Sequence, residues 1–147
     1  MRIYTDGACS GNGMENGGRG GWAAVLLFGD NQKEMSGAVD NTTNNRMELF
    51  AVIQGLRAVT RSLPIEIYSD SAYVVNAVNN GWIANWQKNG WRNAAKAEVK
   101  NQDLWQELVA LNAKYNPTYI KVKGHSGDVF NDRADFLATS AIDRSEK

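Results

Sequence analysis

The sequence predicts a layered α/β domain in which a mixed five-stranded sheet is flanked by helices. Three β-like segments come first, and the Gly29-Asp30-Asn31 stretch between the second and the third is a hairpin turn signal. Helical and β-like segments then alternate, which is typical of strands whose connecting helices pack on the sheet. The 147 residues, of which 43% are hydrophobic, match one domain with a sizeable core. We therefore expect residues 1–147 to form a single domain.

The expected strands are apolar or alternating runs bounded by turn residues. The glycine-rich residues 11–21 are expected to form a loop after the first strand, because they match neither a dinucleotide-binding nor a P-loop pattern. Leu63-Pro64 breaks the chain before the fourth strand. The fifth strand alternates Thr, Ile and Val with Tyr and Lys, which is the period of a half-buried strand. We expect strands at residues 2–8, 22–28, 32–39, 65–69 and 118–123.

The expected helices begin at capping residues and carry apolar side chains at helical spacing. Thr42-Thr43-Asn44-Asn45 supplies N-cap residues for a first helix that runs to about Val59. In a later helix, Leu104, Leu108 and Leu111 recur at i, i+4 and i+7. No regular element is predicted for the Trp-rich and basic residues 82–101. The other expected helices cover residues 71–78, 103–112 and 127–143.

Charge and composition exclude several classes of protein. Lys plus Arg and Asp plus Glu number 16 each, so the formal net charge is zero, which counts weakly against a nucleic-acid-binding protein. The charges are uneven, because residues 82–101 carry three net positive charges and the rest carries three negative ones. Such a basic patch can steer a polyanion to one face. The single cysteine excludes an internal disulfide. We expect neither a signal peptide nor a membrane-spanning segment, and a cytoplasmic location.

Four acidic residues occupy positions where a carboxylate needs an explanation. Asp6 lies at the end of the first predicted strand, and Asp70 lies at the end of the fourth. Glu48 shares an apolar row of its helix, and Asp135 lies in mid-helix beside an apolar stripe. Each acid has an ordinary alternative. Asp6 would be a turn residue and Glu48 a first-turn residue favoured by the helix dipole. Asp70 would be a helix N-cap, and Asp135 would belong to a solvated helix face. Sites in layered α/β domains gather at the carboxyl ends of strands, so we expect the four acids to lie together.

Clustered carboxylates repel one another unless a cation neutralises them. Oxygen ligands suit hard divalent cations, and two ions about 3.5–4 Å apart stabilise both the attacking and the leaving oxygens of a phosphodiester. We therefore predict metal-assisted hydrolysis with two Mg²⁺ ions per site, and with Mn²⁺ as a substitute. His125, the single histidine, lies in a glycine-flanked loop. It is either structural or assists proton transfer and release of the leaving group.

Four segments carry a recognisable pattern. They are Thr5-Asp6-Gly7-Ala8-Cys9, Thr43-Asn44-Asn45-Arg46-Met47-Glu48-Leu49, Ser69-Asp70-Ser71-x-Tyr73-Val74 and Gly124-His125-x-Gly127-x-x-x-Asn131-x-x-x-Asp135. In this order, and over nearly the whole chain, they resemble the type 1 ribonuclease H family, whose members are metal-dependent endonucleases that cleave the RNA strand of an RNA–DNA hybrid. The resemblance implies a ribonuclease H-like fold and that hybrid as the partner, and we expect a monomer.

The resemblance also implies roles for individual residues. Asp6 and Asp70 would hold the ion that activates water, and Asp6, Glu48 and Asp135 the ion at the leaving 3′-oxygen. His125 matches a histidine that assists turnover or product release. The expected substrate-binding residues are Asn12 and Asn45 in the minor groove, Thr43 and Asn85 at a DNA phosphate, Trp82, Lys88, Arg92 and Lys96 in a basic protrusion, and Asn44 and Asn131.

The chain departs from the family pattern at two places. Ala72 stands where many relatives have a glutamine, so we expect one minor-groove contact to be missing. Residues 13–20 form a longer stretch than the usual short turn after Asn12. Two other hypotheses are a non-catalytic hybrid- or RNA-binding module on the same fold, and a ribonuclease H domain of a larger chain. A non-catalytic binding module would have no need of four costly acids. The position of Met1, just before the first strand, favours a free-standing protein over a domain of a larger chain.

Overall fold

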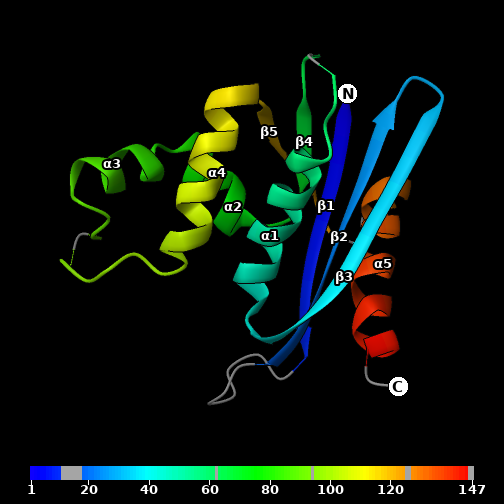
Figure 1. Ribbon diagram of the computed structural model, residues 1–147, viewed down its shortest axis with the longest axis horizontal. Coiled ribbons are helices and arrows are strands. Elements are labelled where there is room, and N and C mark those ends of the chain that lie inside the picture. Colours follow the sequence, from blue (N-terminus) through cyan, green and yellow to red (C-terminus); the bar gives the residue numbers. More distant parts are fainter. Residues whose placement is uncertain (11–17, 62, 94, 125–126, 146–147) are drawn as a thin grey trace.

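A five-stranded mixed sheet forms the centre of the computed structural model, which describes residues 1–10, 18–61, 63–93, 95–124 and 127–145. Its strands are β1 (Arg2–Ser10), β2 (Gly18–Phe28), β3 (Asn31–Thr42), β4 (Glu66–Ser69) and β5 (Thr118–Lys121). They lie in the order β3-β2-β1-β4-β5 (Figure 1). β1, β2 and β3 are antiparallel neighbours, whereas β4 runs parallel to both β1 and β5. The predicted fold class is therefore confirmed.

Helices cover both faces of the sheet. α1 (Asn44–Arg57), α2 (Ala72–Asn79) and α4 (Gln102–Tyr115) lie on one face, and α5 (Val129–Ser145) lies on the other (Figure 1). α3 (Trp82–Lys88) projects from the first group, away from the sheet (Figure 1). Alternate residues of β1 serve the two cores, since Ile3 packs with the α1 side and Tyr4 with the α5 side. None of the described helices combines the length and the apolar character needed to cross a bilayer.

Glycines at the start of β2 belong to the sheet, so the loop expected over residues 11–21 is wrong for residues 18–21. The sequence suggests a loop there because glycine weakens isolated strands. The tertiary structure requires glycine for another reason. A Cβ at Gly21 would collide with the carbonyl of Ala138 in α5, so α5 can approach β2 closely only where the strand has no side chain.

The short helix α3 has no counterpart in the sequence prediction. None of its residues is fully buried, so the segment has no apolar stripe from which helical periodicity could be recognised. Gly81 (φ 77°) precedes it and Gly90 (φ 66°) follows it, both in the left-handed conformation that glycine adopts readily. The other elements were predicted with boundaries that differ by a few residues, as in α4, which continues past residue 112 to Tyr115.

Candidate active site

Asp6 and Asp70 lie at the same level of two neighbouring parallel strands. β1 and β4 pair with Thr5 opposite Ser69, so the residues that follow these two come side by side. The side chain of Ser71, not that of Asp70, caps α2, because its hydroxyl accepts a hydrogen bond from the Val74 amide at 3.3 Å. The alternative interpretation of Asp70 as an N-cap is therefore wrong, and its carboxylate faces the site instead.

Gly7 allows Glu48 to approach Asp6. A Cβ at Gly7 would collide with the backbone of Met47 and Glu48, so the first turns of α1 rest directly on the backbone of β1. Asp6 and Glu48 are each only 4% exposed, and the interpretation of Glu48 as a first-turn residue is wrong, because no acidic residue lies in the first turn of α1. Within the described part of the chain, Asp6 Oδ2 and Glu48 Oε2 have no hydrogen-bond partner. Buried carboxylate oxygens left in this way are costly without a cation.

Four acids meet in one cavity. Asp6, Glu48 and Asp70 each place a carboxylate oxygen within 4.8 Å of the others. Asp135, which is partly exposed on α5, lines the same cavity, whose volume is about 470 Å³. The acids come from β1, α1, the end of β4 and α5, which are far apart in the sequence. The cavity defined by these residues is called the acidic cavity below.

Burial raises the pKa of Asp6 and of Glu48 above the ordinary carboxyl range. Repulsion from neighbouring carboxylates adds to both shifts. Glu48 and Asp70 raise the pKa of Asp6 further, and Asp70 and Asp135 raise that of Glu48 further. A nearby positive charge reverses both effects. The donor set consists of oxygens alone, two of which lack a partner, so the residues fit a hard divalent cation such as Mg²⁺ or Mn²⁺.

A family model described as RNase H matches residues 1–143. The chain belongs to the ribonuclease H family. The ribonuclease H of Syntrophomonas wolfei subsp. wolfei is 56% identical over 141 residues, which are 95% of this chain and 94% of that protein. The ribonuclease H of Thermoanaerobacter sp. strain X514 is 52% identical over 147 residues, which are 100% of this chain and 92% of that protein.

Solved ribonuclease H structures share the fold. The crystal structure of LC9-RNase H1, a type 1 RNase H with the type 2 active-site motif, superposes with a TM-score of 0.82 at 28% identity. The match covers 97% of this chain and 72% of that one. The family predicted from the four motifs is thereby confirmed.

The ribonuclease H substrate residues expected in α1 lie beside the acids. Asn44 and Asn45 line the acidic cavity. Thr43 is exposed and caps α1, because its hydroxyl accepts a hydrogen bond from the Arg46 amide at 3.3 Å. Its predicted contact with a DNA phosphate stays a prediction.

Some of the residues expected in the basic stretch gather at a second cavity. This cavity has a volume of about 260 Å³ and is lined by Trp82, Asn85, Trp86, Asn89, Arg92 and Asn93. Trp82 is 39% exposed, and Lys88 and Lys96 are exposed outside the lining. Of the predicted binding residues, Asn44 and Asn45 therefore line the acidic cavity, and Trp82, Asn85 and Arg92 line the second cavity.

Asn131, Asn12 and His125 are the remaining predicted residues. Asn131 is only 2% exposed, one helical turn before Asp135, and its Oδ1 has no partner among the described residues. Its direct contact with substrate therefore stays a prediction. Asn12 and His125 lie outside the described residues, so their roles also stay predictions.

Sequence reasoning assigned no packing role to Gly7 and no role to Tyr73. Gly7 sets the approach of α1 to β1, and Tyr73 lines the acidic cavity from the first turn of α2. Both stand inside the motifs that identify the family, next to the acids that drew attention. Neither carries a chemical signal of its own, because the role of each depends on what packs against it.

Proposed function

We propose that this chain hydrolyses RNA at the acidic cavity, where Asp6, Glu48 and Asp70 bind a divalent cation and Asp135 completes the site. As a member of the ribonuclease H family, the chain is an endoribonuclease that cleaves the RNA strand of RNA–DNA hybrids. One observation carries the assignment of the site. Four acids from distant parts of the chain converge in one cavity, and two of their buried oxygens lack a partner among the described residues.

The roles of the side chains follow from their positions. Asp6 has carboxylate oxygens of both Glu48 and Asp70 within 4.8 Å and is proposed as the shared ligand, while Asp135 lines the cavity from α5. Packing of α1 on Gly7 holds Glu48 beside Asp6, and both carboxylates are almost fully buried. When bound, two Mg²⁺ ions, or Mn²⁺ in their place, activate water and neutralise charge at the leaving 3′-oxygen. His125 is proposed to assist proton transfer or product release.

Recognition of the hybrid is proposed to use both cavities. Asn44 and Asn45 offer amide groups beside the acids, and such groups can bind the 2′-hydroxyls of an A-like minor groove. The second cavity, with the exposed Lys88 and Lys96 nearby in the chain, offers charge and aromatic surface to the phosphate backbone. A monomeric state and a cytoplasmic location, which the sequence led us to expect, stay predictions.

A cleavage assay tests the proposed function. Labelled RNA–DNA, RNA–RNA and DNA–DNA duplexes of one sequence are incubated with the protein in Mg²⁺ or in EDTA. We expect cleavage of the RNA strand of the hybrid in Mg²⁺ and none of the other duplexes. A protein that shifts the hybrid in a gel but leaves it intact in Mg²⁺ would instead be a hybrid-binding module, and cleavage in EDTA would rule out the metal site.

A further inference from the structure

The segment from Trp82 to Asn101, called the protruding segment below, is joined to the acidic cavity by a row of aromatic rings. Figure 1 shows α3 at its outer end, away from the sheet. Trp86 packs against Trp91 (centroids 6.4 Å apart) and edge-on against the fully buried Trp105 of α4 (5.4 Å). Trp105 in turn packs against Tyr73 (5.4 Å), which lines the acidic cavity. Four rings in contact therefore span from the protruding segment to the cavity wall.

Polar contacts extend this row to α1. The Tyr73 hydroxyl accepts hydrogen bonds from Trp105 Nε1 (2.9 Å) and Asn101 Nδ2 (3.0 Å). Asn101 Oδ1 accepts one from Arg46 Nη1 (3.2 Å), and both terminal nitrogens of Arg46 bond Asp103 at 2.9 Å. The first turns of α1, α2 and α4 are therefore tied together. The Tyr73 network is defined as Arg46, Tyr73, Asn101, Asp103 and Trp105.

Asn101 has an unusual conformation for its position. It is the N-cap of α4 with φ 62° and ψ 28°, a left-handed conformation that is uncommon for residues other than glycine. An N-cap asparagine normally accepts a hydrogen bond from its own helix, but among the described residues the Asn101 side chain makes no such bond. Instead, the Asn101 side-chain oxygen accepts a hydrogen bond from Arg46, and its nitrogen donates one to the Tyr73 hydroxyl. The side chain thus joins α1 to α2, rather than capping α4.

We propose that the Tyr73 network is a positioning device that holds the protruding segment at a fixed distance and orientation relative to the acidic cavity, so that one hybrid contacts both at once. This inference rests on the proposed function. Once the hybrid is bound at one surface, binding at the second is intramolecular, and its strength depends on how well the two surfaces are registered. Arg46 and Asn101 are therefore positioning residues that act on hybrid affinity.

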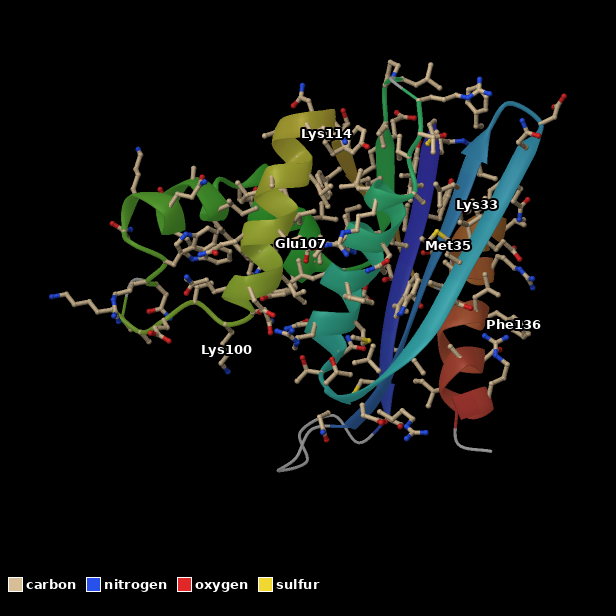
Figure 2. The ribbon with its side chains drawn as sticks, viewed as in Figure 1. Lys33, Met35, Lys100, Glu107, Lys114 and Phe136 are labelled. Atoms are coloured by element: carbon tan, nitrogen blue, oxygen red, sulfur yellow. The ribbon has the colours of Figure 1, made fainter. Side chains whose placement is uncertain are left out.

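The chain offers a matched control for Arg46. Arg57 and Glu107 form a second ion pair between α1 and α4, near the end of α1 remote from the acidic cavity. Figure 2 shows Glu107 on α4 on the side of α1. Arg57→Gln therefore removes an ion pair between the same two helices without touching the Tyr73 network. A role of Arg46 that consisted only of packing α1 on α4 would give both variants the same phenotype.

Steady-state kinetics on a hybrid across a salt series test the proposal. We expect Arg46→Gln to raise KM roughly tenfold and to flatten its salt dependence, while kcat stays within about twofold, because lost uniform binding affects KM. Arg57→Gln should lower Tm comparably but leave KM and its salt dependence unchanged. Asn101→Gly keeps the left-handed backbone and removes the bridge, so it should reproduce the KM effect even if Arg46→Gln fails to fold.

A double-mutant cycle locates the effect. In a background with Lys88, Arg92 and Lys96 changed to Ala, Arg46→Gln should raise KM no further, because the surface that it positions no longer binds. Additive increases, or an equal KM effect of Arg57→Gln, would overturn the proposal. A wild-type protein that binds the hybrid without cleaving it would contradict the proposed function instead, and the same cycle measured as Kd by fluorescence anisotropy would still test the positioning role.

Discussion

The acidic cavity and the protruding segment place their charges in opposite ways. The cavity collects acids from β1, α1, β4 and α5, and holds Asp6 and Glu48 at 4% exposure against the backbone. The protruding segment is continuous in sequence, and its four basic residues Lys88, Arg92, Lys96 and Lys100 are exposed. Chemistry needs charges fixed away from water, whereas attraction of a polyanion needs charges that reach it through solvent. We therefore expect substitutions in the cavity to affect kcat and those in the segment to affect KM.

The largest effect is expected from the loss of one charge in the cavity. Asp70→Asn should reduce cleavage by at least about 1,000-fold, because an amide cannot replace the charge of a metal ligand. Tm should stay the same or rise, since repulsion between neighbouring acids is relieved. Initial rates in Mg²⁺ and a thermal melt measure both. Asp132→Asn, an exposed acid of α5, is the control and should keep wild-type activity. Cleavage by Asp70→Asn within about tenfold of wild type would remove Asp70 from the metal site.

Neutralising the protruding segment should change binding and not chemistry. With Lys88, Arg92 and Lys96 all changed to Ala, the slope of log affinity against log salt should flatten by up to about 2–3, because each phosphate contact contributes roughly 0.9. KM should rise and kcat should change little. The double variant Lys33→Ala, Lys114→Ala removes positive charges from β3 and α4 instead (Figure 2) and should keep the slope. An unchanged slope in the triple variant would mean that the hybrid is held elsewhere, near residues 43–45.

Packing at the cavity should matter more than packing at an open turn. Gly7→Ala should destabilise the protein by about 1–3 kcal/mol and lower cleavage, because the added methyl collides with the backbone of Met47 and Glu48. Gly29→Asn is the control, since nothing lies within 4 Å of a Cβ there and asparagine tolerates its φ of 55°. It should change stability by less than about 0.5 kcal/mol. Urea unfolding measures both, and equal stabilities would contradict the close contact at Gly7.

The smallest expected effect is that the pKa values of Asp6 and Asp103 are shifted in opposite directions. Burial raises the pKa of Asp6, whereas hydrogen bonds and charge from Arg46 hold the pKa of Asp103 below its ordinary range. Because the pKa of Asp6 is raised, Asp6 lowers the stability of the folded, metal-free protein as pH rises above the ordinary carboxyl pKa of about 4. Because the pKa of Asp103 is lowered, the stability that Asp103 contributes is lost as pH falls below that ordinary value.

Side-chain NMR titration of the metal-free protein measures this difference directly. The Asp6 midpoint should lie above the ordinary value and the Asp103 midpoint below it. In Arg46→Gln, Asp103 should return to the ordinary range while Asp6 stays raised. A midpoint of Asp103 that does not respond to Arg46→Gln would contradict the ion pair between Arg46 and Asp103.

Much of the fold and of the site could be predicted from local sequence patterns. Alternation, capping residues and turn signals are local properties, and they were sufficient for the mixed sheet, for the α1 cap at Thr43 and for the family motifs. The position of Asp70 directly after a strand followed from the same patterns, because it needs no tertiary information to be found. The prediction that Asp6 ends the first strand is wrong, since β1 continues to Ser10 by pairing with β2 beyond the end of its pairing with β4. The apolar row around Glu48 likewise indicated a buried carboxylate before the structure placed it beside Asp6.

Contacts between distant residues were decided by the tertiary structure alone. The approach of α1 to β1 depends on what a side chain at residue 7 would strike, and no local pattern contains that. α3 lacks a buried stripe, and Asn131, which was predicted to bind substrate, is only 2% exposed. Arg46 and Asn101 are 55 residues apart, so their hydrogen bond exists only after α1 and α4 have packed. The sequence determined which residues are proposed to carry the chemistry, while packing determined how far apart the acids and the basic segment are held.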